Sequence, residues 1–94
     1  MKNEIQEKIR EILEAGLLEE CFNHTITTKD LLREVASIVP LSKKDETEIK
    51  KTINDYKYNH WYKNEQDEQY IISLCCREII EYVFETKLNF INSI

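Results

Sequence analysis

The chain has 94 residues, one Pro, one Gly, three Cys and a formal net charge of −5. This length predicts one domain over residues 1–94, with a single core and too little volume for a deep substrate cavity beside it. No run of 18 apolar residues is present, which predicts no membrane span. The start of the chain lacks an apolar signal core, so we expect a cytoplasmic protein. Because Gly and Pro are the costly residues in helices, their scarcity favours a mainly α fold.

The cysteines and the absence of catalytic motifs argue against a metal site and against an enzyme. Cys21, Cys75 and Cys76 cannot all form disulfides, which fits a reducing compartment. Cys21 and His24 have the spacing of half a zinc site, but the adjacent pair Cys75 and Cys76 rarely reaches one tetrahedral centre. The sequence has no Gly-rich phosphate loop, no Gly-flanked Ser and no His-Glu-x-x-His helix. We therefore expect a binding protein and not an enzyme, with no metal, no cofactor and no small-molecule substrate.

The first predicted element is an amphipathic helix over residues 1–20. Ile5, Ile9 and Leu13 recur at helical spacing between charged residues, so one face of the helix is apolar. Gly16 fits a helix C-cap, and the alternative is that the helix continues for one further turn through residues 17 and 18.

Residues 26–63 predict a helix-turn-helix-like unit. Thr27 and Asp30 form a capping pair for a helix over residues 28–37, and Pro40 stops it. The side chains expected to be buried in this helix are Leu31, Leu32, Val35 and Ile38. Ser42 and Asp45 then cap a second helix through residue 57. The apolar positions of this second helix are sparse, namely Ile49, Ile53 and Tyr56, so most of its circumference faces water or a partner.

Residues 64–94 predict a long C-terminal helix that includes Cys75 to about Phe90. The aromatic run His60–Lys63 predicts a strand. For Tyr70–Leu74 two alternatives stay open, because short apolar runs fit either element: the return strand of a hairpin, or the start of the long helix. The first alternative gives a winged-helix-like domain with a small β-hairpin wing, and the second gives an all-α bundle of four helices.

Three stretches of this sequence resemble a known domain. They are residues 26–32 (ITTKDLL), 41–56 (LSKKDETEIKKTINDY) and 60–63 (HWYK). Together they resemble the winged-helix domain at the C-terminus of phage and pathogenicity-island replication proteins of the virulence-associated protein E type. The resemblance implies a winged helix, and a protein of a phage or mobile element connected with replication or its control. It implies no primase or helicase activity, because the chain has no such domains.

The middle of the chain is the only part with an excess of basic residues. Residues 25–63 carry eight basic and six acidic side chains, whereas residues 1–24 carry three and six, and residues 64–94 carry two and six. A polar, partly basic second helix is what a helix-turn-helix unit places in the major groove. The residues predicted to contact nucleic acid are Lys43, Lys44, Thr47, Lys50, Lys51, Asn54, Lys57, Trp61 and Lys63. The competing interpretation is that these lysines, interleaved with acids, form an ordinary solvated helix face.

Two further predictions concern protein partners. The acidic ends can steer the chain towards a basic protein partner, which makes a protein-binding module or inhibitor the alternative to a DNA-binding protein. The acidic residues concerned are Glu4, Glu7, Glu11, Glu14, Glu65, Asp67, Glu68, Glu78, Glu81 and Glu85. Apolar residues also spread over more than one face of the C-terminal helix, which favours a homodimer. The residues predicted for this interface are Tyr82, Phe84, Leu88, Phe90 and Ile91.

Overall fold

The computed structural model describes residues 2–18, 28–56 and 68–93. In these ranges it contains the helices α1 (Lys2–Leu18), α2 (Thr28–Ala36), α3 (Lys43–Asp55), α5 (Glu68–Thr86) and α6 (Leu88–Asn92), and no strand. The prediction of a mainly α protein is therefore confirmed. No helix in the described ranges is long and apolar enough to cross a membrane.

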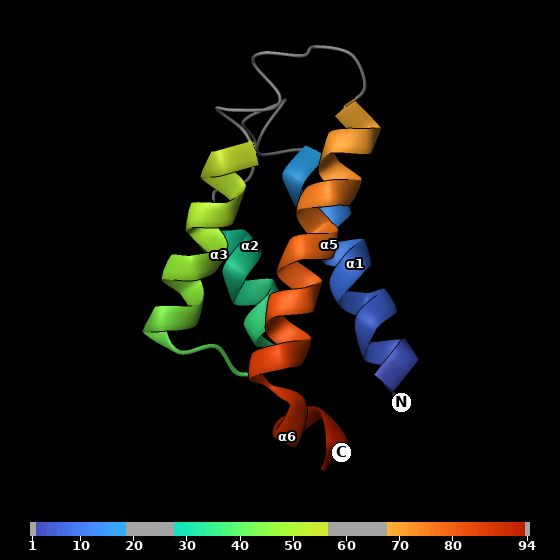
Figure 1. Cartoon of the computed structure of the whole chain (residues 1–94), viewed down its shortest axis with the longest axis vertical. Helices are drawn as coiled ribbons and strands as arrows, with labels where there is room; N and C mark the ends of the chain where they lie inside the picture. The colour runs from blue at the N-terminus through green and yellow to red at the C-terminus, as the bar shows by residue number, and fades with distance from the viewer. Residues whose placement is uncertain (1, 19–27, 57–67, 94) are drawn as a thin grey trace.

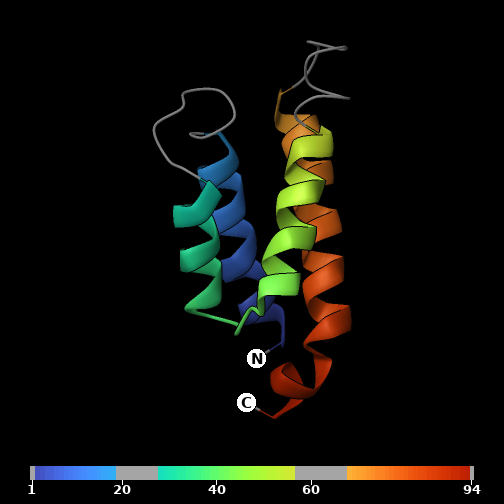
Figure 2. The same cartoon turned by 90° about the vertical axis from the view of Figure 1, so that its left-hand side faces the viewer.

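The four longer helices alternate in direction along the chain (Figures 1 and 2). α1 packs against α2 and α5, and α5 also packs against α3. Residues 37–42 join α2 to α3 at one end of the molecule, and α6 turns back at the same end. This is the up–down arrangement of a helix bundle. Within the described residues it consists of four longer helices and the short α6, compared with the four helices of the all-α alternative.

One hydrophobic core runs between the helices. Each of the four longer helices contributes residues at three- or four-residue spacing, so its apolar stripe faces inward. The fully buried residues of largest volume come from all four longer helices and the α2–α3 link: Ile9, Leu13, Leu17, Leu31, Leu32, Val35, Val39, Ile49, Ile53, Cys76, Ile79 and Val83.

Gly16 lies inside α1 and does not cap it. α1 continues to Leu18, so the alternative of a further turn is confirmed and the C-cap at Gly16 is wrong. Gly16 is buried, and a Cβ atom added there would overlap Cδ1 of Leu31 in α2. The missing side chain therefore lets α1 and α2 approach closely.

Replacing Gly16 with alanine is expected to lower the free energy of unfolding. Alanine improves the helix propensity by about 1 kcal/mol. Inserting a methyl group against a fully buried Leu31 has a larger effect of opposite sign, typically about 1–3 kcal/mol. Urea denaturation measures the net change, with Ala15→Gly at the exposed neighbouring position as the control for propensity alone. A more stable Gly16→Ala variant would show that the α1–α2 contact has room for the methyl group.

α2 agrees with its prediction at three buried positions and differs at its end. Leu31, Leu32 and Val35 are buried as expected, whereas Ile38 is only half-buried and Val39 is fully buried. The helix stops at Ala36, ahead of Pro40, and the next turn is tightened by the bonds from the Ile38 and Val39 N–H groups to the Val35 carbonyl, at 3.0 and 3.1 Å. The expected cap residue Thr27 lies outside the described residues.

Tyr70–Leu74 is helical, so the hairpin in which this segment is the return strand is wrong. The segment belongs to α5 because Ile72, Cys76 and Ile79 continue one buried face through the whole helix. The predicted strand His60–Lys63 lies outside the described residues. α5 also ends earlier than expected, at Thr86 instead of Phe90, and α6 begins after Lys87.

Candidate nucleic-acid interface

The start of α3 is fixed by a capping box, as its sequence predicted. The Ser42 hydroxyl accepts a hydrogen bond from the Asp45 N–H at 3.1 Å, and Oδ2 of Asp45 accepts one from the Ser42 N–H at 2.8 Å. Two backbone donors at the helix start are thereby satisfied. The box sets the orientation of the first turn, which carries Lys43 and Lys44.

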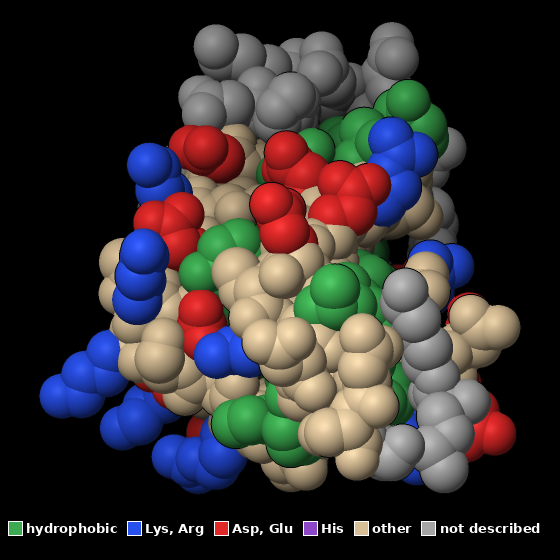
Figure 3. All heavy atoms as spheres, turned by 60° about the horizontal axis from the view of Figure 1, so that its bottom comes forward, with side chains coloured by type: hydrophobic (Ala, Val, Ile, Leu, Met, Phe, Trp, Pro, Cys, Tyr) green, Lys and Arg blue, Asp and Glu red, His purple; other side chains and the backbone are tan. Residues whose placement is uncertain are grey.

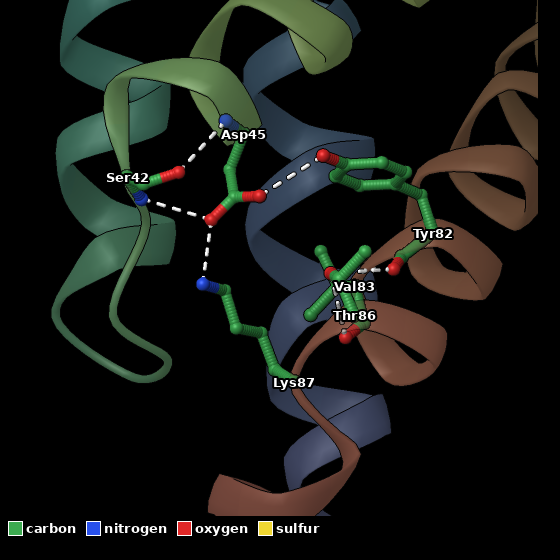
Figure 4. Close-up of polar contacts among 6 residues, drawn as sticks. All are labelled: Ser42, Asp45, Tyr82, Val83, Thr86 and Lys87. Atoms are coloured by element: carbon green, nitrogen blue, oxygen red, sulfur yellow. Dashed lines mark hydrogen bonds and ion pairs between the residues drawn. The ribbon is translucent and has the colours of Figure 1, made fainter.

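The same carboxylate ties α3 to the end of α5 (Figure 4). The Tyr82 hydroxyl donates to Oδ1 of Asp45 at 2.9 Å, and the Lys87 Nζ lies 2.6 Å from Oδ2. The Asp45 side chain is 7% exposed and that of Lys87 is 22% exposed, so this ion pair is largely shielded from water. Asp45 is therefore both a local cap and a long-range anchor.

α5 ends at Thr86, next to the anchor. The Thr86 hydroxyl donates to the Tyr82 carbonyl at 2.8 Å, a bond that often bends a helix. Lys87 lies between the two helices with φ −112° and ψ 22°, and its side chain reaches back to Asp45. The break lets the buried Ile91 of α6 join the core.

Burial and hydrogen bonding shift the ionisation of these groups. Burial by itself raises the pKa of Asp45, but the bonds from Lys87, the Ser42 amide and Tyr82 outweigh it, so the pKa lies well below its ordinary value of 3.8. Burial and the bond to Asp45 raise the pKa of Tyr82 from 10.0 to about 12. Burial and a hydrogen bond with Glu78 raise the pKa of Tyr56 to about 12 as well.

These shifts predict that stability falls at both ends of the pH scale. A depressed carboxyl pKa stabilises the fold above pH 3.8, and this contribution is lost as the pH falls below that value. Raised tyrosine pKa values stabilise the fold below pH 10.0, and this contribution is lost as the pH rises from 10.0 to about 12. Thermal unfolding followed by circular dichroism should show both declines. Asp45→Asn should flatten the acid decline and Tyr82→Phe the alkaline one; profiles parallel to wild type would contradict the assignment.

The outward face of α3 brings together six of the predicted contact residues. Lys43, Lys44, Thr47, Lys50, Lys51 and Asn54 are all exposed. Since successive residues turn by about 100° in a helix, these six fall within one arc of about 120°. No carboxylate lies in that arc. The interleaving of lysines and acids seen along the sequence thus separates on the folded helix into a basic arc with acidic edges.

Carboxylates flank this basic arc on both sides. Glu46 and Glu48 are half-buried at its edges, and Asp55 is exposed near its far end. On α5 the exposed residues Glu78, Glu81 and Glu85 recur at helical spacing and form a second acidic strip. Figure 3 shows Lys and Arg side chains along one edge of this view, further ones at the opposite edge, and carboxylates between them. The basic arc of α3 is therefore bordered by negative charge.

The remaining predicted contact residues and the predicted dimer residues have different outcomes. Lys57, Trp61 and Lys63 lie outside the described residues. The five residues predicted for a dimer interface do not form one exposed face: Ile91 is 3% exposed, Tyr82 and Phe84 are half-buried against the core, and Leu88 and Phe90 are 42% and 37% exposed. Packing within one chain thus covers three of the five.

The sequence did not predict the long-range half of the Asp45 network. The spacing Ser42-x-x-Asp45 identified the capping box, but Tyr82 and Lys87 lie 37 and 42 positions further along the chain, and no local pattern marks them. Among the described residues no group of three or more His, Cys, Asp or Glu side chains is arranged to hold a metal ion.

No protein-family model, no curated protein and no solved structure matches the chain.

Proposed function

We propose that this chain is a non-enzymatic DNA-binding accessory or regulatory protein of a phage or mobile element, linked to replication or its control. The proposed contact surface is the basic arc of α3: Lys43, Lys44, Thr47, Lys50, Lys51 and Asn54. The link to a mobile element rests on the resemblance of residues 26–63 to the winged-helix domain of replication proteins. The link to DNA rests on the arc.

The observation that carries the proposal is the separation of charge on α3. Four lysines share one exposed arc with Thr47 and Asn54, and the acids of the same helix lie at its edges or, like Asp45, in the interior. A basic helix face of this width suits the major groove, which admits one α-helix.

The net charge of −5 sets the expected strength of binding. Acids on α1 and α5 do not contribute to phosphate binding, so the affinity comes from the four lysines of the arc. For four phosphate contacts, the logarithm of the association constant should fall with the logarithm of the salt concentration with a slope of about −3.6. We therefore expect moderate affinity that is strongly reduced by salt.

Fluorescence anisotropy of labelled duplex and single-stranded DNA at several salt concentrations tests the proposal. We expect binding to duplex DNA at low salt, with a slope near the value for four contacts. No binding at low salt, or binding that salt does not weaken, would reject the arc as a DNA surface.

The outer face of α1 supports a second candidate function, the docking of a basic protein. Glu4, Glu7, Glu11 and Glu14 are exposed and recur at three- and four-residue spacing, so they form one acidic stripe. α1 lies across the bundle from α3 (Figure 1). Such a stripe favours encounter with a positively charged partner surface.

One variant separates the two candidates. Replacing Glu4, Glu7, Glu11 and Glu14 by glutamine removes the charge of the stripe and keeps the size of each side chain. If DNA is the partner, the variant binds DNA at least as tightly as wild type because the net charge is less negative. If a basic protein is the partner, the variant captures it less well in pull-downs, and DNA binding is absent in both proteins.

A further inference from the structure

The six residues of the basic arc are not randomly placed within it. With about 100° of turn per residue, Thr47 and Asn54 fall near the centre line of the arc. Lys43 and Lys50 lie on one side of that line, and Lys44 and Lys51 lie on the other. The uncharged hydrogen-bonding residues are thus flanked by lysines on both sides.

This arrangement matches the cross-section of a DNA groove. A helix in the major groove has base edges in front of it and a phosphate backbone on either side. Side chains on its centre line meet the bases, and long side chains at its flanks reach the phosphates. Lysine suits the flanks, since its charge sits at the end of a flexible stem.

Asn54 has the chemistry to read a base directly. Its exposed amide offers a donor and an acceptor side by side, which pair with N7 and the N6 amino group of adenine. No other residue of the arc offers this bidentate pattern, because lysine carries donors alone.

Thr47 offers mainly its methyl group. Its hydroxyl donates to the Lys43 carbonyl at 2.9 Å within α3, so the donor is already used. The side chain can still contact the C5 methyl of thymine, which is the apolar feature of the major groove. Thr47 and Asn54 are seven residues apart, which corresponds to about 10.5 Å along the helix axis. That distance spans about three base pairs.

We infer that Thr47 and Asn54 are the specificity-determining residues of the arc, and that they select duplex sites with a thymine and an adenine about three base pairs apart. This inference rests on the proposed DNA-binding function. The four flanking lysines supply affinity for any sequence, and the two centre-line residues supply the preference.

Selection from a randomised duplex library with the full chain tests the inference. We expect enrichment of an adenine and a thymine at that spacing. Asn54→Ala should reduce the preference for adenine at its position by at least about fivefold, while the salt slope stays that of wild type because no charge is removed. Lys50→Gln is the matched control. It should weaken binding to all sequences alike and reduce the magnitude of the salt slope by about 1, the value of one phosphate contact.

A second comparison isolates the Thr47 methyl group. Replacing the selected thymidine by deoxyuridine removes one methyl from the DNA and should weaken wild-type binding by about fourfold. Thr47→Ser keeps the hydroxyl and removes the protein methyl, so this variant should no longer distinguish the two DNAs. DNA binding with no enriched bases, or an Asn54→Ala variant that retains the adenine preference, overturns this inference and leaves the proposed function standing. An absence of DNA binding overturns both.

Discussion

Asp45→Ala is expected to lower the free energy of unfolding by about 3–5 kcal/mol, the range typical of breaking a buried ion pair by removing one partner. The variant leaves the 22%-exposed Lys87 without its counter-ion and removes the acceptor of the Tyr82 hydroxyl. It also removes half of the capping box of α3. A loss of this size is a large share of the 5–15 kcal/mol that stabilises a typical domain. Urea denaturation of the two proteins measures the difference.

An exposed carboxylate in an exposed ion pair provides the control. Oε1 of Glu81 lies 3.8 Å from Nε of Arg77, and their side chains are 69% and 71% exposed. Exposed pairs contribute at most about 1 kcal/mol, so Glu81→Ala should change stability far less than Asp45→Ala. Equal effects of the two substitutions would show that the Asp45 network is no anchor. The double variant Asp45→Ala with Lys87→Met should be more stable than the sum of the single changes predicts, because no unpaired buried charge remains.

Replacing Lys50 and Lys51 by glutamate is expected to reduce duplex DNA affinity by about 30-fold or more at 0.15 M salt. Each phosphate contact makes binding about fivefold tighter at 0.15 M salt than at 1 M salt, so losing two contacts costs about 25- to 30-fold. The introduced carboxylates add repulsion. The salt slope should fall by about 1.8. Both residues are exposed, so the fold should be unaffected, which circular dichroism checks. Anisotropy titration measures the affinity.

A second charge reversal tests position against net charge. Lys8 in α1 and Lys29 in α2 are exposed and lie outside the arc, and replacing both by glutamate changes the net charge by the same amount. We expect this variant to bind DNA within a few-fold of wild type. If both double variants lose affinity equally, overall charge governs binding and the arc has no special role.

Much of the helical architecture could be predicted from local patterns. Helical spacing placed the apolar stripes of α1, α2 and α3, and the Ser42–Asp45 spacing placed the start of α3 to the residue. The basic arc also follows from sequence once α3 is known to be one unbroken helix, because the angular position of each residue is then fixed.

The features that could not be predicted depend on contacts between distant segments. Gly16 fits a C-cap locally, and only the closeness of Leu31 in α2 gives it a different role. Tyr70–Leu74 is apolar enough for strand or helix, and its helical state follows from packing in the bundle. The break at Lys87 occurs without Gly or Pro, and the Lys87 side chain there pairs with Asp45 of another helix, which no local pattern marks.

A two-dimensional ¹H–¹⁵N NMR titration of the labelled protein with a short duplex at low salt locates the DNA-binding surface directly. The amide signals that shift or broaden most should belong to α3, chiefly those of Lys43, Thr47, Lys50, Lys51 and Asn54, while the amides along the α1 stripe stay unchanged. No perturbed signals at low salt, or perturbations centred on α1 or α5, would contradict the claim that the outer face of α3 binds DNA.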